Sequence, residues 1–248
     1  MEDLYEYLSN EFNAHFSGWD FSYLEGRMEE DKLPWNYQNI VEKACSGRNR
    51  LLDMDTGGGE LLCSLSNLPK QVFATEGYKP NIPIAENRLK ERGYYLKPVK
   101  ASSEIPFEDE YFDIIINRHG SFDINILKRT LQKNGLFITQ QVGGLNGIDM
   151  NMAFETKTMN YVEWCLIKNI EIFKNSGMEI LDYEEYVGKM KFKDIGALVY
   201  YLKCIPWQVK DFSIEKYYNK LTIINDIIQK KDFIDFTMHR FYIVVRKL

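Results

Sequence analysis

Residues 50–60 constrain the fold more than any other part of the chain. Their sequence, RLLDMDTGGGE, is typical of a short apolar strand that ends in a carboxylate, turns through three glycines and enters a helix. Glycine permits a tight turn and leaves room for a ligand, because it has no side chain. The following helix offers free N–H groups and the positive end of its dipole. Such a unit predicts an α/β protein that binds a nucleotide-like ligand at this turn.

Short β-rich runs alternate with helical patterns between residues 50 and 142. We expect strands at residues 50–54, 71–76, 96–101, 112–117 and 136–142, and helices at residues 60–68, 81–92 and 122–133. Continuous apolar runs such as FDIII at 112–116 suit strands that are covered on both faces. The alternation therefore predicts βαβ units, a parallel sheet and right-handed crossovers.

The pattern changes on both sides of this region. After residue 142 we expect a helix at 157–174, an extended segment at 178–192, helices at 195–205 and 213–231, and a last strand at 240–246. A last strand that returns to the sheet makes residues 178–248 part of the same domain. The first 40 residues are rich in aromatic and acidic side chains. They predict a cap over the ligand crevice, although a segment covering a sheet edge would have the same composition.

Composition excludes several classes of protein. The net charge of −5 is not that of a broad nucleic-acid surface. The chain has no apolar run of about 18 residues and begins with acidic residues, so we expect neither a membrane span nor a signal peptide. The four cysteines are widely spaced without a CxxC pair, which favours reduced thiols in the cytoplasm over disulfides or a metal site.

Polar side chains gather where the predicted strands end, which is where open α/β sheets bind ligands. Glu76 lies 23 residues after Asp53, at the end of the second strand. An acid at this place can accept hydrogen bonds from both hydroxyls of a ribose. Together with the glycine turn one βα unit earlier, it indicates a nucleoside-containing cofactor.

The glycine turn does not have the spacing of the dinucleotide fingerprint G-x-G-x-x-G. Gly57, Gly58 and Gly59 are followed by Glu60, an acid that would repel a pyrophosphate. An amino-acid tail tolerates acids better, because its ammonium can be met by a carboxylate such as that of Asp53. The turn therefore indicates S-adenosylmethionine rather than NAD.

These residues resemble the class I S-adenosylmethionine-dependent methyltransferases over roughly residues 48–145. LDMDTGGG at 52–59 resembles the first motif, LDxGxGxG, and TEGY at 75–78 resembles the ribose-binding second motif. IPFEDEYFD at 105–113 resembles the approach to the fourth strand, and KRTLQKNG at 128–135 resembles the segment leading into the fifth. The chain departs from the family where Asp55 replaces the first glycine and where Ala101 stands in place of an aspartate near adenine.

The resemblance implies a Rossmann-like class I methyltransferase fold. This fold has a mostly parallel, seven-stranded sheet with an antiparallel last strand, helices on both faces and, in this chain, an N-terminal helical cap. We expect the cap at residues 1–40 and the methyltransferase domain at 41–248. Within that domain, residues 48–145 form the cofactor half and residues 146–235 the substrate-side elements.

The resemblance also assigns residues to the cofactor. Asp53, Gly57 and Gly59 surround the methionine moiety, Glu76 holds the ribose, and Gly77 and Tyr78 border the adenine. Because Ala101 has no polar group, the base contact falls to Ser102, Ser103 or backbone groups. The predicted cofactor-binding residues are Asp53, Asp55, Thr56, Gly57, Gly59, Glu76, Gly77, Tyr78, Ser102, Ser103, Asn117 and Arg118.

His119 is the candidate catalytic residue, because a histidine titrates in the range that suits a general base. A histidine that only orients its loop explains the sequence as well, since methyl transfer from a sulfonium needs chiefly in-line positioning. The predicted acceptor-binding residues are Trp35, Tyr37, Gln140, Gln141 and Tyr200.

The sequence favours transfer of a methyl group to an O, N or C nucleophile of a small-molecule acceptor. An RNA base is the alternative acceptor, with Lys189, Lys191, Lys193 and Arg240 as a phosphate-binding surface. An NAD-dependent oxidoreductase and a non-catalytic cofactor-binding relative are further alternatives. The acceptor and the oligomeric state do not follow from the sequence.

Overall fold

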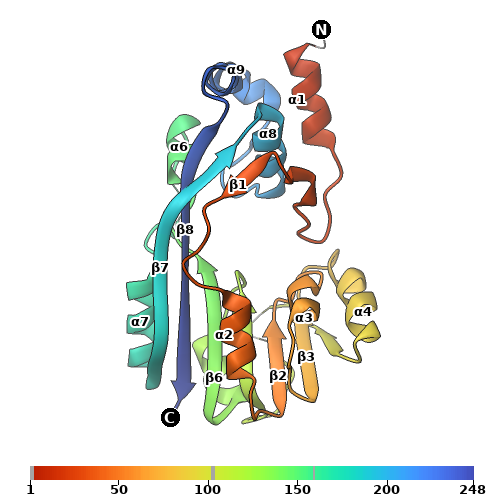
Figure 1. The fold of residues 1–248 in the computed structure, drawn as a ribbon, viewed down its shortest axis with the longest axis vertical. Coiled ribbons are helices and arrows are strands. Elements are labelled where there is room, and N and C mark those ends of the chain that lie inside the picture. The colour runs from red at the N-terminus through yellow and green to blue at the C-terminus, as the bar shows by residue number, and fades with distance from the viewer. Residues whose placement is uncertain (1–2, 102–103, 159) are drawn as a thin grey trace.

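The computed structural model describes residues 3–101, 104–158 and 160–248, and its centre is a parallel sheet (Figure 1). Four neighbouring pairs, β2–β3, β3–β4, β2–β5 and β5–β6, run parallel, as the βαβ pattern predicts. These strands are β2 (Arg50–Met54), β3 (Gln71–Glu76), β4 (Tyr95–Pro98), β5 (Phe112–Arg118) and β6 (Leu131–Val142). Their carboxyl ends lie at one edge of the sheet, next to the upper part of the molecule (Figure 1).

Two long strands complete the sheet on one side. Strand β8 (Ile234–Lys247) runs antiparallel to β6, and β7 (Met178–Phe192) runs antiparallel to β8. The antiparallel last strand is therefore confirmed, and it begins earlier than residue 240. The sheet has eight strands rather than seven, in the order β1-β7-β8-β6-β5-β2-β3-β4. The additional strand, β1 (Met28–Glu30), pairs with the free edge of β7 that the longer strand offers.

Helices cover both faces of the sheet, as the class I fold requires. One face is covered by α2 (Tyr37–Ala44), α3 (Glu60–Ser64) and α4 (Ile82–Glu91), which share a core with β2, β3 and β5. The other face is covered by α5 (Ile124–Thr130) and α7 (Leu166–Asn175). Aliphatic residues of the central strands alternate between these cores, so that Leu51 faces the first and Leu52 the second.

The predicted helix at 157–174 was too long, because α7 begins only at Leu166. The preceding segment is held in a turn in which the Trp164 amide donates to the carbonyl of Tyr161, at 2.8 Å. Gly144 approaches this turn closely, and its own amide donates to the Trp164 carbonyl at 2.6 Å. A Cβ on Gly144 would lie 2.3 Å from the Tyr161 oxygen, so only glycine permits this packing.

The upper lobe in Figure 1 is built from both ends of the chain. Helix α1 (Leu4–Asn13) packs with α8 (Ile195–Cys204) and α9 (Ile214–Lys231) in a third core, which also takes in the upper ends of β7 and β8. The short helices α6 (Ile148–Ala153) and η1 (Ser22–Leu24) contribute Met150 and Leu24 to this core. The aromatic N-terminal segment therefore belongs to a larger lobe that stands over the carboxyl edge of the parallel strands.

Arg27 fixes the N-terminal segment to this lobe. Its guanidinium forms ion pairs with Asp194 at 2.6 Å and with Glu11 at 3.0 Å, joining the segment to the start of α8 and to α1. Among the described residues, none of the helices combines the length and hydropathy needed to cross a bilayer.

Candidate cofactor-binding site

The loop after β2 turns as the glycines predict. Gly57 and Gly59 have φ values of 65° and 81°, in the left-handed region that favours glycine. The Thr56 amide donates to the Thr75 carbonyl at 2.9 Å, which anchors the loop to β3. Asp55 also has a left-handed φ of 56°, so the departure from the family motif keeps a conformation for which glycine is better suited. The helix after the loop, α3, has only five residues, and its dipole contributes less than the sequence suggested.

Glu76 joins the loop after β2 to the turn after β3. Its Oε2 accepts from the Gly57 amide at 2.7 Å, and its Oε1 accepts from the Tyr78 amide at 2.6 Å. The side chain is buried, with 4% of the residue exposed. A carboxylate oxygen has two lone pairs, so each oxygen retains the capacity to accept a further hydrogen bond. The glycine turn and the turn after β3 are therefore joined through a carboxylate that can accept a pair of hydroxyls.

Three carboxylates, those of Asp53, Asp55 and Glu76, lie at the carboxyl ends of β2 and β3. Burial, with the neighbouring charges of Asp55 and Glu76, raises the pKa of Asp53 to about 7. Burial and the charge of Glu76 raise the pKa of Asp55 to about 6. Like charges at close range disfavour ionisation, and a bound cation would reverse that effect. A positively charged ligand would therefore be stabilised beside these carboxylates.

The end of β5 is tied to the ends of β2 and β6 by a buried amide network. Asn117 Nδ2 donates to the Met54 carbonyl at 3.1 Å, and Asn117 Oδ1 accepts from Gln141 Nε2 at 2.8 Å. Gln141 also donates to the Gly120 carbonyl at 3.0 Å. A Cβ on Gly120 would lie 2.7 Å from the Asp55 side chain. The loops after β2 and β5 are thus in direct contact.

Comparison with known proteins agrees with this geometry. Residues 52–139 match the family model of a methyltransferase domain, from the end of β2 into β6. These residues are similar in sequence to methyltransferase domains, and they include the glycine turn and Glu76. Among curated proteins, no sequence matches the chain at a significant level.

Solved structures share the methyltransferase fold at low sequence identity. A proposed methyltransferase from Bacillus halodurans C-125 has a TM-score of 0.61 and 16% identity, over 86% of this chain and 98% of that chain. A methyltransferase from Thiobacillus denitrificans, in complex with S-adenosyl-L-homocysteine, has a TM-score of 0.51 and 12% identity, over 86% and 91%. A geranyl diphosphate methyltransferase, in complex with GPP and sinefungin, has a TM-score of 0.51 and 12% identity, over 85% of this chain and 77% of that chain. At these identities the likeness shows the fold.

His119 directly follows β5 and has a defined hydrogen-bond role. Trp35 Nε1 can only donate, and it donates to Gln140 Oε1 at 2.8 Å, which orients the Gln140 amide. The Gln140 nitrogen then faces His119 Nε2 at 3.2 Å. His119 Nε2 is therefore the acceptor of this bond, and Nδ1 carries the proton of the neutral ring.

The charge of His119 follows from its surroundings. Desolvation, followed by the positive charges of Arg240 and Arg118, lowers the pKa of His119 well below its ordinary value. Solvent still reaches the residue and screens these charges in part. The imidazole is neutral at pH 7, and its Nε2 lone pair is already engaged by Gln140.

Arg118 ends β5 on the same face of the sheet as Gln140. Its Cα is paired with that of Gln140 in the sheet, and the residue is exposed. Among the described residues it has no hydrogen bond or ion pair within the usual limits. Its guanidinium is therefore an unpaired positive charge, within the described part of the chain, at the carboxyl end of β5.

Two predicted acceptor residues have structural contacts instead of free polar groups. The Tyr37 hydroxyl donates to the carbonyls of Asn117 and Ile138, at 3.1 and 3.2 Å. The Tyr200 hydroxyl donates to the His15 carbonyl at 3.0 Å, and 1% of Tyr200 is exposed. Gln140 and Gln141 point to opposite faces of β6, as alternation predicts.

The remaining predicted cofactor residues lie after β3 and β4. Gly77 closes on the loop after β4, where a Cβ would meet the Val99 carbonyl at 3.3 Å. Ser102 and Ser103 lie outside the described residues. Trp19, which the sequence placed only within the aromatic segment, contacts both Tyr78 and the glycine turn. A glycine directly before an exposed tryptophan was the available signal, because it marks a turn that presents the ring.

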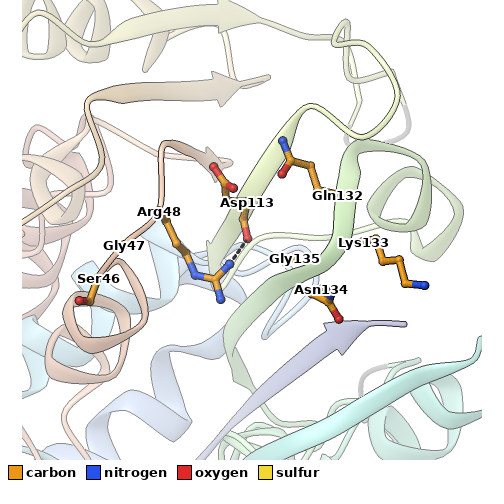
Figure 2. A pocket seen from close by; sticks show the side chains of 8 residues that line it. All are labelled: Ser46, Gly47, Arg48, Asp113, Gln132, Lys133, Asn134 and Gly135. Atoms are coloured by element: carbon orange, nitrogen blue, oxygen red, sulfur yellow. Dashed lines mark hydrogen bonds between the residues drawn. The ribbon is translucent and has the colours of Figure 1, made fainter.

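A separate cavity of about 330 Å³ lies at the opposite, amino edge of the strands (Figure 2). Its main charged groups have structural partners. Arg48 donates to the Asp113 carbonyl at 2.8 Å, and the Asp113 carboxylate accepts from the amides of Asn49 and Arg50, at 2.9 and 2.8 Å. Open α/β sheets bind ligands at the other edge, so the methyltransferase site is not placed here.

Proposed function

We propose that the chain binds S-adenosylmethionine at the glycine turn and transfers its methyl group to an O, N or C nucleophile of a small-molecule acceptor. The position of Glu76 carries this proposal. Its carboxylate is fixed by the Gly57 and Tyr78 amides, one on each side of the crevice, and retains acceptor capacity for the two ribose hydroxyls.

The residues around Glu76 fit the other parts of this cofactor. Asp53 and Asp55 supply negative charge for the ammonium and the sulfonium of the cofactor. These two positive groups would in turn favour the ionised forms of both carboxyls. Gly57 has room in front of it, since a Cβ there meets only Trp19 Cδ1, at 4.0 Å. Asn81, directly after the turn that contains Tyr78, is fully buried, and neither of its amide atoms has a partner in the described part of the chain. An orphaned amide here is a candidate partner for a polar edge of the base.

Bound S-adenosylmethionine supplies an electrophilic methyl group on a sulfonium, and the protein's main task is to align an acceptor with it. Neutral His119, free Arg118 and Gln140 border the acceptor side. His119 Nδ1–H is a donor in this arrangement, which supports orienting the acceptor more than removing its proton. The likeness in fold to a methyltransferase whose substrate is geranyl diphosphate supports a small-molecule acceptor by analogy.

The contacts of the basic strip do not favour RNA as the acceptor. Lys189 pairs with Asp235 at 3.5 Å, Lys193 pairs with Glu29, and Lys191 lies over the Phe233 ring at 5.2 Å. Arg240 is buried and pairs with Glu30 at 2.7 Å. Paired cations release fewer counterions on binding a phosphate backbone, so this strip is a weak RNA surface.

The four cysteines carry free thiols, in keeping with a cytoplasmic location.

Thermal unfolding with S-adenosylmethionine, S-adenosylhomocysteine and NAD in parallel tests the cofactor, because a ligand of the native state raises the unfolding temperature. We expect a rise with the first two ligands and none with NAD. A rise with NAD alone would point to an oxidoreductase, and no rise with any would contradict cofactor binding. Incubation of metabolite extracts with methyl-labelled S-adenosylmethionine would then identify the acceptor class.

A further inference from the structure

The turn at residues 17–20 presents Trp19 in an unfavourable backbone conformation. Gly18 and Trp19 both have left-handed φ values, 65° and 56°, and the Asp20 amide donates to the Ser17 carbonyl at 3.1 Å. This is the pattern of a type I′ turn, which glycine and asparagine tolerate and a bulky aromatic residue does not favour. Burial does not compensate for the conformation, because 41% of Trp19 is exposed.

This turn reaches from the upper lobe to the cofactor half of the domain. Gly18 is buried against α4, where a Cβ would lie 3.2 Å from Ile84 Cδ1. The Trp19 ring lies 6.3 Å from the Tyr78 ring and 5.7 Å from that of Trp207, between their centroids. Its Cδ1 lies 4.0 Å from the position of a Cβ on Gly57. Trp19 therefore pairs with two aromatic rings from distant parts of the sequence and lies next to the glycine turn.

Two of these contacts are with the residues that fix Glu76. Gly57 and Tyr78 are the donors to the Glu76 carboxylate, and Trp19 pairs with the Tyr78 ring and lies next to Gly57. Glu76 itself is 4% exposed, and Trp19 stands beside both of its backbone donors. Hydrogen bonds to a carboxylate that is shielded from water are stronger than those made in solvent.

We propose that Trp19 is a cofactor-binding residue that closes the ribose and adenine part of the site over Glu76 and Tyr78. This inference rests on the proposed function and adds the N-terminal turn to the binding site. The ring offers an aromatic face to the nucleoside opposite Tyr78, and it excludes water from the Glu76 carboxylate. The lobe that bears the turn is held by Arg27, so the contact is part of the folded structure.

Calorimetric titration of the full chain with S-adenosylhomocysteine tests the assignment, with Trp19→Ala, Trp19→Phe and Tyr183→Ala compared with the wild type. Stacking of a ring on a base implies about a tenfold loss of affinity in Trp19→Ala and a much smaller loss in Trp19→Phe. Tyr183→Ala is the control, because this tyrosine is exposed on β7 and contacts neither the glycine turn nor Tyr78. Trp19→Ala should also leave the unfolding temperature without ligand nearly unchanged, since the ring is partly exposed.

Tryptophan emission gives a second readout that does not depend on the alanine variant. Addition of S-adenosylhomocysteine should change the emission of the wild type, and the change should be clearly smaller in Trp19→Phe. Equal affinity in Trp19→Ala and the wild type would overturn the assignment. Tighter binding by Trp19→Ala would also overturn it, because the ring would then obstruct the site. Failure of the wild type itself to bind would instead contradict the proposed function.

Discussion

At the scale of single residues, Glu76 and Asp55 show how far the sequence motif determines the site. The position of Glu76 at the end of the second strand was predictable, and its two backbone donors follow from the turns on each side. The structural consequence of Asp55 was not predictable, because its left-handed φ and its contact with the loop after β5 depend on tertiary packing.

Glu76→Gln should fold and lose S-adenosylhomocysteine affinity by roughly tenfold or more. A glutamine places an NH₂ group against one of the two amide donors, and a hydrogen bond to a charged group contributes about 1.5–3 kcal/mol. Calorimetric titration measures the loss, with Glu184→Gln, an exposed acid on β7, as the control. Retention of full affinity by Glu76→Gln would show that the ribose is bound elsewhere.

The pKa of Asp55, raised from 3.8 to about 6 in the folded protein, predicts a pH dependence with a definite sign. The folded state holds the proton more tightly than the unfolded state, so unliganded stability falls as the pH rises from about 4 to about 6. Asp55→Asn should raise the unfolding temperature above this range and flatten the profile within it. Thermal unfolding at a series of pH values measures both effects, and an unchanged profile would contradict the assigned shift.

At the scale of elements, the central strands were predictable because each is a continuous apolar run followed by turn residues. Phe112–Arg118 is an example, since its aliphatic residues fill the cores on both faces. The N-terminal strand at Met28–Glu30 was not predictable, because MEE has no strand pattern and pairs only where β7 offers a free edge. The start of α7 depended on the packing of Gly144, which sequence periodicity does not record.

Gly120→Ala should weaken cofactor binding through the contact between two loops. The added Cβ would lie 2.7 Å from the Asp55 side chain and from Asn117 Nδ2, and overpacking of this kind costs about 1–3 kcal/mol. Gly93→Ala is the control, because its φ of 72° gives strain while no atom lies within 4 Å of the added group. Both variants should lose stability, and only Gly120→Ala should lose affinity for S-adenosylhomocysteine. Equal affinity of Gly120→Ala and the wild type for S-adenosylhomocysteine would show that this loop does not contribute to the site.

At the scale of the whole molecule, the sequence predicted the class I fold and a cap but not how the cap is built. The motifs lie in the cofactor half, where local sequence and fold agree. The upper lobe combines α1 with α8 and α9 through packing between distant segments. Trp19 reaches the cofactor half only because this lobe stands over the strand ends. The division at residue 40 stays a prediction, although α2, which begins at Tyr37, already packs on the sheet.

Arg27→Met should loosen the N-terminal segment without unfolding the sheet. The substitution removes the cation that Glu11 and Asp194 share, and Glu11 is only 8% exposed. An unpaired buried charge costs about 3–5 kcal/mol of folding free energy, and the cost is smaller for partly exposed groups such as these. Limited proteolysis should show faster cleavage before residue 28 in the variant, while residues from 37 onward stay protected. Lys32→Met is the control, because Lys32 is exposed and forms no ion pair with the described residues. Unchanged cleavage would show that Arg27 does not hold the segment.

A crystal structure with S-adenosylhomocysteine bound tests the central claim most directly. We predict that the ribose hydroxyls donate to the Glu76 carboxylate, that the amino-acid tail lies at Asp53 and Gly57, and that the adenine lies beside Tyr78 under Trp19. A ligand bound at the opposite edge of the sheet, in the cavity lined by Arg48 and Asp113, or a ribose away from Glu76, would contradict the account.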